Sequence, residues 1–493
     1  MIHVSDLIAY QRCPRFSWNR TNIHEPFQGF YHMEAPFSRY WMEYFSCQDV
    51  PSGKTGDSNE DTLELLKNLD RVINVRMEYK GCRTRIPLLE KCEDGYKATY
   101  MYLNSYPKES ESLIMKINQQ IAASIGIEIT QHQIFYLNKE YVRQDQLDIQ
   151  SCFLTSNQLF NRKNKLNKTI EQCMEEQIFD LDTWISQTQE VVYMEQPPEM
   201  QRSKQCTSNR RCMYYDQCFD DSQLPDNSVL FLTTSQNKMN AFHNGIKHIH
   251  ELDLDQLDGF RLQYAQYIAS KKGRFVDGWA LHAWLHAIEK PVCYLDFEWD
   301  TFAIPPYKGM KPFDVLCFQY SLHIEPENEP LYHKDFFDTG DCREAFIQSL
   351  LKDIPEKGAI LVYNMEGAEK LRLQQLAVQF PQYKEQLDAI CDRMVDLSKP
   401  FEAGLFYDNK MRGHYSLKNV LPVFTDEYSY KQLNIQDGMD AVFSYRNMEK
   451  VDKDQQEQIR ESIRNYCRMD TYAEVIIYHG LMAIDKEMLE CQI

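Results

Sequence analysis

The chain has 493 residues, of which 43% are hydrophobic and 13% aromatic, a composition typical of globular proteins. This length exceeds one ordinary hydrophobic core, and we expect two or three domains of roughly 150 to 200 residues. The formal net charge of -19 argues against a protein that coats nucleic acid non-specifically, because phosphate binding requires a positive surface.

The N-terminal residues and the cysteine count predict a compartment. The chain begins without a basic segment followed by an apolar stretch, so we expect no signal peptide. No apolar run is long enough to span a bilayer, and we expect no membrane partner. Fifteen cysteines without a secretion signal favour a reducing cytoplasmic setting, with thiols free or bound to metal.

The first motif is Ser5-Asp6-Leu7-Ile8-Ala9-Tyr10-Gln11-Arg12-Cys13-Pro14-Arg15. It predicts a short helix that Ser5 or Asp6 caps and Pro14 ends. Cys13 is also a candidate metal ligand, together with three later cysteines that are spaced six residues apart, Cys206, Cys212 and Cys218. Thiolates in such a set favour a soft metal or an iron-sulfur centre, whereas the structural alternative is four buried, unligated cysteines.

This arrangement resembles the cysteine-clustered branch of RecB-like (PD-(D/E)XK) nucleases, which includes CRISPR-associated exonucleases. The resemblance covers residues 1–225 and implies a restriction-endonuclease-like fold with an iron-sulfur cluster. The gap from Cys206 to Cys212 is longer than usual in the family, so Zn²⁺ stays an alternative.

The active-site positions of that family are altered in this chain. Pro87 stands where the metal-binding Asp is expected, and Tyr100 and Tyr102 stand at the E-x-K positions. Neither proline nor tyrosine replaces those groups. We expect a domain without nuclease chemistry that binds a strand or docks protein partners, although a shifted alignment would recruit Glu78, Glu90 or Asp94.

Residues 226–290 follow a helical pattern and are predicted to form a helical connector. Five histidines in this region suggest a metal: His243, His248, His250, His282 and His286. A structural role is favoured for them because no carboxylate or cysteine accompanies them in a recognisable pattern.

Residues 291–493 open with an apolar run, Val292-Cys293-Tyr294-Leu295-Asp296-Phe297-Glu298-Trp299. In a strand, Asp296 and Glu298 project from the same face because side chains alternate with a period of two. Two like charges on one face need cations, protons or solvent, so the pair is either a metal site or an exposed strand end. Asp485-Lys486-Glu487 has the same spacing within an apparent helix, which shows how weak the spacing is alone.

Further strands and helices follow this pair. Strands are expected at residues 313–323, 331–336 and 358–364, and a helix at 343–351, which is the order of an α/β domain. Glu369, with Glu366 as its rival, lies on the first turn of the helix after the strand at 358–364. Tyr466 and Asp470 are four residues apart and share one face of a late helix.

Three motifs follow one another in this part of the chain: D-x-E, then Asn364 with an acid, then Y-x-x-x-D. Their order is similar to that of the motifs in the DnaQ-like, or DEDDy, 3′-5′ exonucleases, and the resemblance covers about residues 291–485. The chain departs at the second motif, where Glu369 lies one residue late and Ala368 replaces an aromatic residue.

The resemblance implies a ribonuclease H-like fold with two Mg²⁺ or Mn²⁺ ions. Asp296 would bridge the ions, Glu298 and Asp470 would bind one each, and Glu369 would complete the site. Tyr466 would orient the attacking water.

Other residues of this domain are candidates for supporting roles. Asp396, at the end of a predicted strand, either joins the metal site or makes structural hydrogen bonds. Arg412, Tyr415 and Lys418 are candidates for binding the nucleic-acid strand.

Together the patterns predict a cytoplasmic, two-metal 3′-5′ exonuclease of single-stranded or frayed nucleic acid, with DNA favoured. The alternative is a noncatalytic nucleic-acid-binding or complex-forming protein in which both nuclease folds have decayed.

Overall fold

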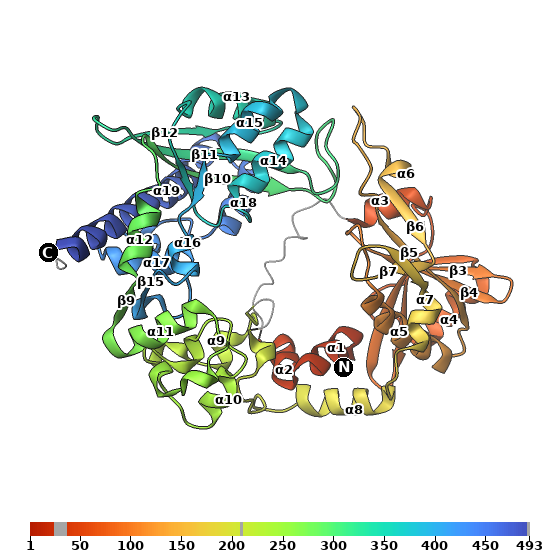
Figure 1. The fold of residues 1–493 in the computed structure, drawn as a ribbon. Coiled ribbons are helices and arrows are strands. Elements are labelled where there is room, and N and C mark those ends of the chain that lie inside the picture. Colours follow the sequence, from red (N-terminus) through yellow and green to blue (C-terminus); the bar gives the residue numbers. More distant parts are fainter. Residues whose placement is uncertain (24–36, 208–210, 491–493) are drawn as a thin grey trace. The chain divides into compact units, whose positions relative to one another are not determined.

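The computed structural model describes residues 1–23, 37–207 and 211–490 (Figure 1). The chain divides into two compact units. Unit 1 is Met1–Phe219 with Phe302–Phe313, and unit 2 is Asp220–Thr301 with Asp314–Ile493. Each unit combines helices with a β-sheet, so the prediction of a mixed α/β protein with several domains is confirmed at that level.

The unit boundaries differ in three places from the predicted domains, the first being that unit 1 ends at Phe219 and not at residue 225. Residues 226–290 belong to unit 2 and are not entirely helical, because strand β9 (Arg274–Val276) pairs antiparallel with β15 (Phe406–Asp408). Phe302–Phe313, expected in the C-terminal domain, groups with unit 1. There the guanidinium of Arg143 donates a hydrogen bond of 2.8 Å to the carbonyl oxygen of Pro305.

Unit 1 is built on a six-stranded sheet in the order β1-β3-β4-β5-β6, with β2 on the other side of β3. Strands β2, β3 and β4 form an antiparallel meander, and β5 runs parallel to β4. Beside the sheet lies a small hairpin of β7 and β8. The strands are β1 (Ile2–His3), β2 (Arg71–Tyr79), β3 (Cys82–Cys92), β4 (Gly95–Met101), β5 (Ile129–Leu137), β6 (Phe153–Ser156), β7 (Gln158–Phe160) and β8 (Leu166–Thr169).

The helices of unit 1 are α1 (Val4–Arg12), α2 (Pro14–Asn22), α3 (Phe37–Tyr44), α4 (Asn59–Asn68), α5 (Ser112–Ser124), α6 (Ile149–Cys152), α7 (Ile170–Glu175), α8 (Leu181–Val192) and α9 (Tyr215–Cys218). Helices α4, α5 and α7 pack on the sheet, whereas α2 packs on α1 and α8. The capping residue predicted for α1 is wrong. His3 is the N-cap, and its backbone N–H donates to the Asp6 carboxylate at 2.8 Å. Pro14 ends α1 as expected, and it also opens α2, since a proline in the first turn loses no helical hydrogen bond.

Unit 2 contains a five-stranded sheet in the order β12-β11-β10-β13-β14. Strands β10, β11 and β12 are antiparallel neighbours, whereas β13 and β14 run parallel to β10. The strands are β10 (Val292–Thr301), β11 (Val315–Glu325), β12 (Tyr332–Phe337), β13 (Ile360–Val362) and β14 (Met394–Asp396). Each lies where the apolar runs of the sequence predict a strand.

The helices of unit 2 are α10 (Lys238–His243), α11 (Arg261–Lys272), α12 (Gly278–Leu285), α13 (Arg343–Asp353), α14 (Glu369–Gln379), α15 (Lys384–Cys391), α16 (Lys399–Glu402), α17 (Leu417–Phe424), α18 (Gly438–Asn447) and α19 (Lys453–Glu490). Helices α13, α14 and α15 cover one face of the sheet, and the long α19 runs along the other (Figure 1). Within the described part of the chain, no helix is both long enough and apolar enough to cross a membrane.

Candidate metal centre

Strand β10 places Asp296 and Glu298 on the face of the sheet that α19 covers. Its alternate residues Cys293, Leu295 and Phe297 point the other way, into the core formed with α13, α14 and α15. The period of two therefore turns the two acids toward α19. Glu298 is 6% exposed and Asp296 is half-buried, so the pair is not an exposed strand end.

Glu369 enters the same region from the first turn of α14. Before this helix, Asn364 adopts the left-handed conformation, with φ of 64°, where the chain leaves β13. Asp396 fixes this turn, because its carboxylate accepts the backbone N–H groups of Asn364 and Met365, each at 3.1 Å. Asp396 thus makes the structural hydrogen bonds that were one of its two predicted roles.

The rival acid, Glu366, points elsewhere. Glu366 is exposed and forms an ion pair of 3.0 Å with Lys370. Glu369 is 2% exposed, and burial together with the charge of Asp296 raises its pKa well above the ordinary value. The structure therefore brings Glu369, and not Glu366, to the acids of β10.

Helix α19 supplies the remaining side chains. Tyr466 and Asp470 lie on one face, four residues apart, and are 5% and 7% exposed. Glu474, one further turn along the same face, is 1% exposed and was missed in the sequence. Its spacing from Asp470 was a usable signal, because a face that buries three polar side chains in succession is unusual for an ordinary amphipathic helix.

Two other neighbours have no counterpart in the sequence motifs. The Cys467 thiol donates to the Asp296 carboxylate at 3.0 Å, and ligand atoms of Asp296, Glu298 and Cys467 all lie within 4.8 Å of one another. The Tyr430 hydroxyl donates to Asp470 Oδ1 at 2.6 Å. These contacts hold two of the carboxylates in fixed orientations.

The negative charges of these carboxylates are unfavourable in the protein when no cation is bound. Burial is the first cause that raises the pKa of all five carboxyl groups, and their mutual repulsion adds to it for Asp296, Glu298, Glu369 and Glu474. Asp470 has a pKa raised to about 6. Among the described residues, no Lys or Arg forms an ion pair with any of the five, and Lys418 is the cation whose charge lowers the pKa of Glu298 and Asp470.

This donor set fits hard divalent cations. Buried carboxylates without partners are costly, and they are stabilised by ions that prefer oxygen ligands, such as Mg²⁺ or Mn²⁺. Glu369 Oε2 and Glu474 Oε2 are buried and accept no hydrogen bond in the described structure, so both oxygens have free lone pairs. The residues of the chain therefore suit an ion that would lie between β10, α14 and α19.

The three residues predicted to bind nucleic acid have different surroundings. Exposed Lys418, on the first turn of α17, places its ammonium 5.2 Å and 5.4 Å from the ring centroids of Tyr430 and Tyr466, beside the acids. The Arg412 guanidinium instead lies 4.6 Å from the Phe231 ring and pairs with Asp226 at 3.3 Å. The carbonyl oxygen of Tyr415 accepts a hydrogen bond from Tyr363.

The four predicted ligand cysteines lie in unit 1. Cys13 separates α1 from α2, and Cys206, Cys212 and Cys218 follow α8. The backbone N–H of Cys212 donates to the carbonyl oxygen of Cys206 at 2.8 Å. Burial, with the charges of Cys212 and Cys13, raises the pKa of the Cys218 thiol. The Cys13 and Cys212 thiols therefore lie near that of Cys218, but none of the four belongs to a described set of three ligand atoms that all lie within 4.8 Å of one another.

The altered nuclease positions of unit 1 contain no cluster of acids among the described residues. Pro87 lies in β3, Tyr100 is buried in β4, and Tyr102 follows β4. Of the acids that a shifted alignment would recruit, Glu78 pairs with Arg83 at 2.9 Å, and Glu90 pairs with Arg71 and Lys97. Asp94 is exposed in the turn between β3 and β4.

The comparisons with known proteins reach part of unit 2 and the segment Phe302–Phe313 of unit 1. Searches of curated proteins and of solved structures found no match. Residues 293–416, from β10 to the segment before α17, match the model of a domain of unknown function, DUF2779. The matched region contains Asp296, Glu298 and Glu369 and ends before Tyr466 and Asp470.

Proposed function

We propose that the chain is a divalent-metal-dependent 3′-5′ exonuclease that acts on single-stranded or frayed nucleic acid, with DNA favoured. The observation that carries the proposal is the meeting of five carboxylates from β10, α14 and α19, four of them buried and Asp296 half-buried, without a Lys or Arg ion pair in the described structure. Two-metal hydrolysis of a phosphodiester uses such a set, because two ions bound there would stabilise the charge on the attacking and leaving oxygens.

The sheet of unit 2 supports a ribonuclease H-like assignment. Its strands, numbered along the chain within this sheet, lie in the order 3-2-1-4-5. The first three are antiparallel and the last two are parallel to the first. That arrangement agrees with the resemblance of Asp296, Glu298, Tyr466 and Asp470 to the DnaQ-like motifs. Glu474 lies one turn beyond the last motif and adds an acid that the resemblance does not require.

The side chains of the site have separate tasks in this proposal. Asp296, between Cys467 and the other acids, would hold both ions, and Glu298, Glu369 and Asp470 would complete their coordination. Burial and the neighbouring carboxylates raise the pKa of Tyr466, so its hydroxyl stays protonated and orients the attacking water by a hydrogen bond. The exposed ammonium of Lys418 would bind the phosphate next to the cleaved bond.

Unit 1 would hold the strand or a protein partner without cutting. Its antiparallel meander followed by the parallel strand β5 is compatible with a RecB-like fold, and we propose that Cys13, Cys206, Cys212 and Cys218 bind an iron-sulfur cluster, with Zn²⁺ as the alternative. Iron, sulfide and zinc analysis of anaerobically purified protein distinguishes the two.

The activity is tested with a single-stranded oligonucleotide labelled at its 5′ end, in Mg²⁺ or Mn²⁺. The wild type is expected to give a ladder of progressively shorter labelled products, and the variant Asp296→Ala with Glu298→Ala is expected to give none. Glu385→Ala with Asp392→Ala is the matched control, because it removes two exposed carboxylates from the α15 region.

Three results would contradict the proposal in different ways. Equal activity of the Asp296/Glu298 variant and the wild type would exclude this site. Remaining internal cleavage in that variant would indicate that unit 1 cuts. Strand binding without hydrolysis in any metal would favour the noncatalytic alternative.

A further inference from the structure

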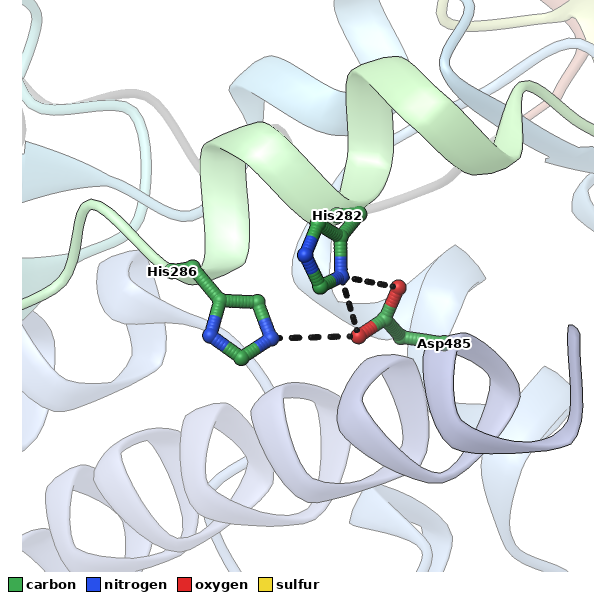
Figure 2. A group of neighbouring side chains, drawn as sticks. All are labelled: His282, His286 and Asp485. Atoms are coloured by element: carbon green, nitrogen blue, oxygen red, sulfur yellow. Dashed lines mark hydrogen bonds and ion pairs between the residues drawn. The ribbon is translucent and has the colours of Figure 1, made fainter. Parts of the chain in front are cut away.

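A second group of possible metal ligands lies in unit 2, apart from the five carboxylates. His282 is in α12 and His286 is the C-cap of that helix, so the two imidazoles lie one turn apart on the same face. Asp485 comes from the last turns of α19, which packs against α12 (Figure 2). Ligand atoms of the three residues all lie within 4.8 Å of one another.

The two imidazoles converge on one carboxylate. His282 Nδ1 lies 3.1 Å from Oδ1 and 3.0 Å from Oδ2 of Asp485, and His286 Nε2 lies 3.4 Å from Oδ2 (Figure 2). His282 Nδ1 lies within hydrogen-bond distance of both Asp485 oxygens, whereas the 3.4 Å from His286 Nε2 is longer than a good N–H···O hydrogen bond. Hydrogen bonding therefore accounts for the contact of His282 with Asp485 but poorly for that of His286.

The same distances suit ligands of one tetrahedral ion. Zinc binds imidazole nitrogen and carboxylate oxygen at about 2.0 to 2.2 Å, which places two ligand atoms of a tetrahedral site roughly 3.3 to 3.6 Å apart. The observed separations of 3.0 to 3.4 Å need only a small adjustment. Two histidines one helical turn apart, joined by a carboxylate, are a recurrent zinc-binding arrangement.

Burial and charge are consistent with this reading. The Asp485 side chain is 5% exposed, and the described chain gives it no Lys or Arg ion-pair partner. The side chains of His282 and His286 are 34% and 54% exposed, so solvent reaches the nitrogen side of the group. Three protein ligands with one open position leave room for a water molecule as the fourth ligand.

The backbone brings the two helices close together at this point. A Cβ on Gly278, the first residue of α12, would lie 2.4 Å from Cε of Met488, one turn beyond Asp485 on α19. The packing of α12 on α19 at this point places the histidines over the carboxylate. Asp485 is eleven residues after Glu474, or about 16 Å along the helix, so this group is separate from the carboxylate centre.

We propose that His282, His286 and Asp485 bind one Zn²⁺-class ion, which joins α12 to the end of α19. The ion is of a different kind from those at the carboxylate centre, because imidazole nitrogen favours zinc, cobalt or nickel over Mg²⁺. Its role is to fix the helix that also carries Tyr466 and Asp470. The proposal does not depend on the exonuclease activity.

The test counts bound zinc in the full chain. Protein treated with EDTA is dialysed against Zn²⁺ in excess Mg²⁺, which occupies the carboxylate centre, and zinc is measured by atomic absorption. The wild type is expected to hold one more Zn²⁺ per chain than His286→Asn or Asp485→Asn, because each variant lacks one of the three protein ligands. Zinc is also expected to raise the melting temperature of the wild type more than that of either variant.

His243→Asn is the matched control, since His243 is an exposed histidine at the end of α10, and it should bind as much zinc as the wild type. Any zinc bound by the cysteines of unit 1 contributes equally to the zinc content of every variant, so it does not affect the difference between them. Equal zinc content in the wild type and His286→Asn would overturn the proposal and leave the group as an ion pair. A lower melting temperature of His286→Asn in EDTA, without loss of bound zinc, would overturn it as well.

Discussion

Replacement of Asp470 by Asn is expected to stabilise the metal-free protein while it weakens metal binding. Burial raises the Asp470 pKa from 3.8 to about 6. Between these two values only the unfolded chain releases the proton, so the folded state binds more protons and its stability falls as pH rises. Each pKa unit corresponds to about 1.4 kcal/mol, so ionisation of Asp470 above pH 6 lowers the free energy of unfolding by about 3 kcal/mol. The Asn side chain avoids this cost, and its amide oxygen can still accept the Tyr430 hydrogen bond.

Denaturant unfolding of EDTA-treated protein measures the effect. Above the titration window, at about pH 7.5, Asp470→Asn should raise the free energy of unfolding by about 1 to 3 kcal/mol, and at about pH 4 the gain should vanish. Mn²⁺ should stabilise the wild type more than the variant. Asp454→Asn, an exposed replacement on the same helix, should stay within about 1 kcal/mol of the wild type. A loss of stability in Asp470→Asn that is equal at both pH values would refute the reasoning.

Three other substitutions address the site and its support. Tyr466→Phe removes the hydroxyl that orients water and should lower the single-turnover rate about 100-fold with Mn²⁺ affinity unchanged; a parallel loss of affinity would argue against that role. Arg446→Met removes both hydrogen bonds of 2.6 Å to the buried Asp300 carboxylate, and denaturant unfolding should show a loss of about 3 to 5 kcal/mol. Burial lowers the pKa of His323 from 6.5 to about 3, so the wild type should lose about 1.4 kcal/mol of stability per pH unit as pH falls through that window. His323→Asn should show a shallower slope in the same titration.

Apolar runs predicted β10, β11 and β13 well, because strands buried on both faces leave a strong local pattern. Strands β10 to β14 all lie at expected positions. The pairing of β9 with β15 could not be predicted, since each strand has three residues and the two are more than a hundred residues apart. For the same reason, no local pattern assigned Phe302–Phe313 to unit 1.

The candidate site was predicted only where its residues form local patterns. Alternation in β10 and the four-residue spacing in α19 identify Asp296, Glu298, Tyr466 and Asp470, whereas Tyr430 reaches Asp470 from a separate loop. The distinction between Glu366 and Glu369 required the turn that Asp396 holds.

The group of His282, His286 and Asp485 also combines residues that no local sequence pattern connects. The sequence favours a structural role for His282, because no carboxylate or cysteine accompanies the histidines in a recognisable pattern, yet Asp485 lies 203 residues later in the chain. Asp485 also belongs to the D-x-E sequence that served as a comparison for Asp296 and Glu298. Its partners come from another helix, and only the packing of α12 on α19 brings them together.

The central claim is that the buried carboxylates between β10, α14 and α19 bind catalytic divalent ions. The most direct measurement is a Mn²⁺ titration in which electron paramagnetic resonance follows the free ion, with the wild type compared to Asp296→Asn combined with Glu298→Gln. The variant should bind two fewer Mn²⁺ ions per chain than the wild type, because both replaced side chains would be metal ligands. Equal Mn²⁺ binding by the two proteins would contradict the claim.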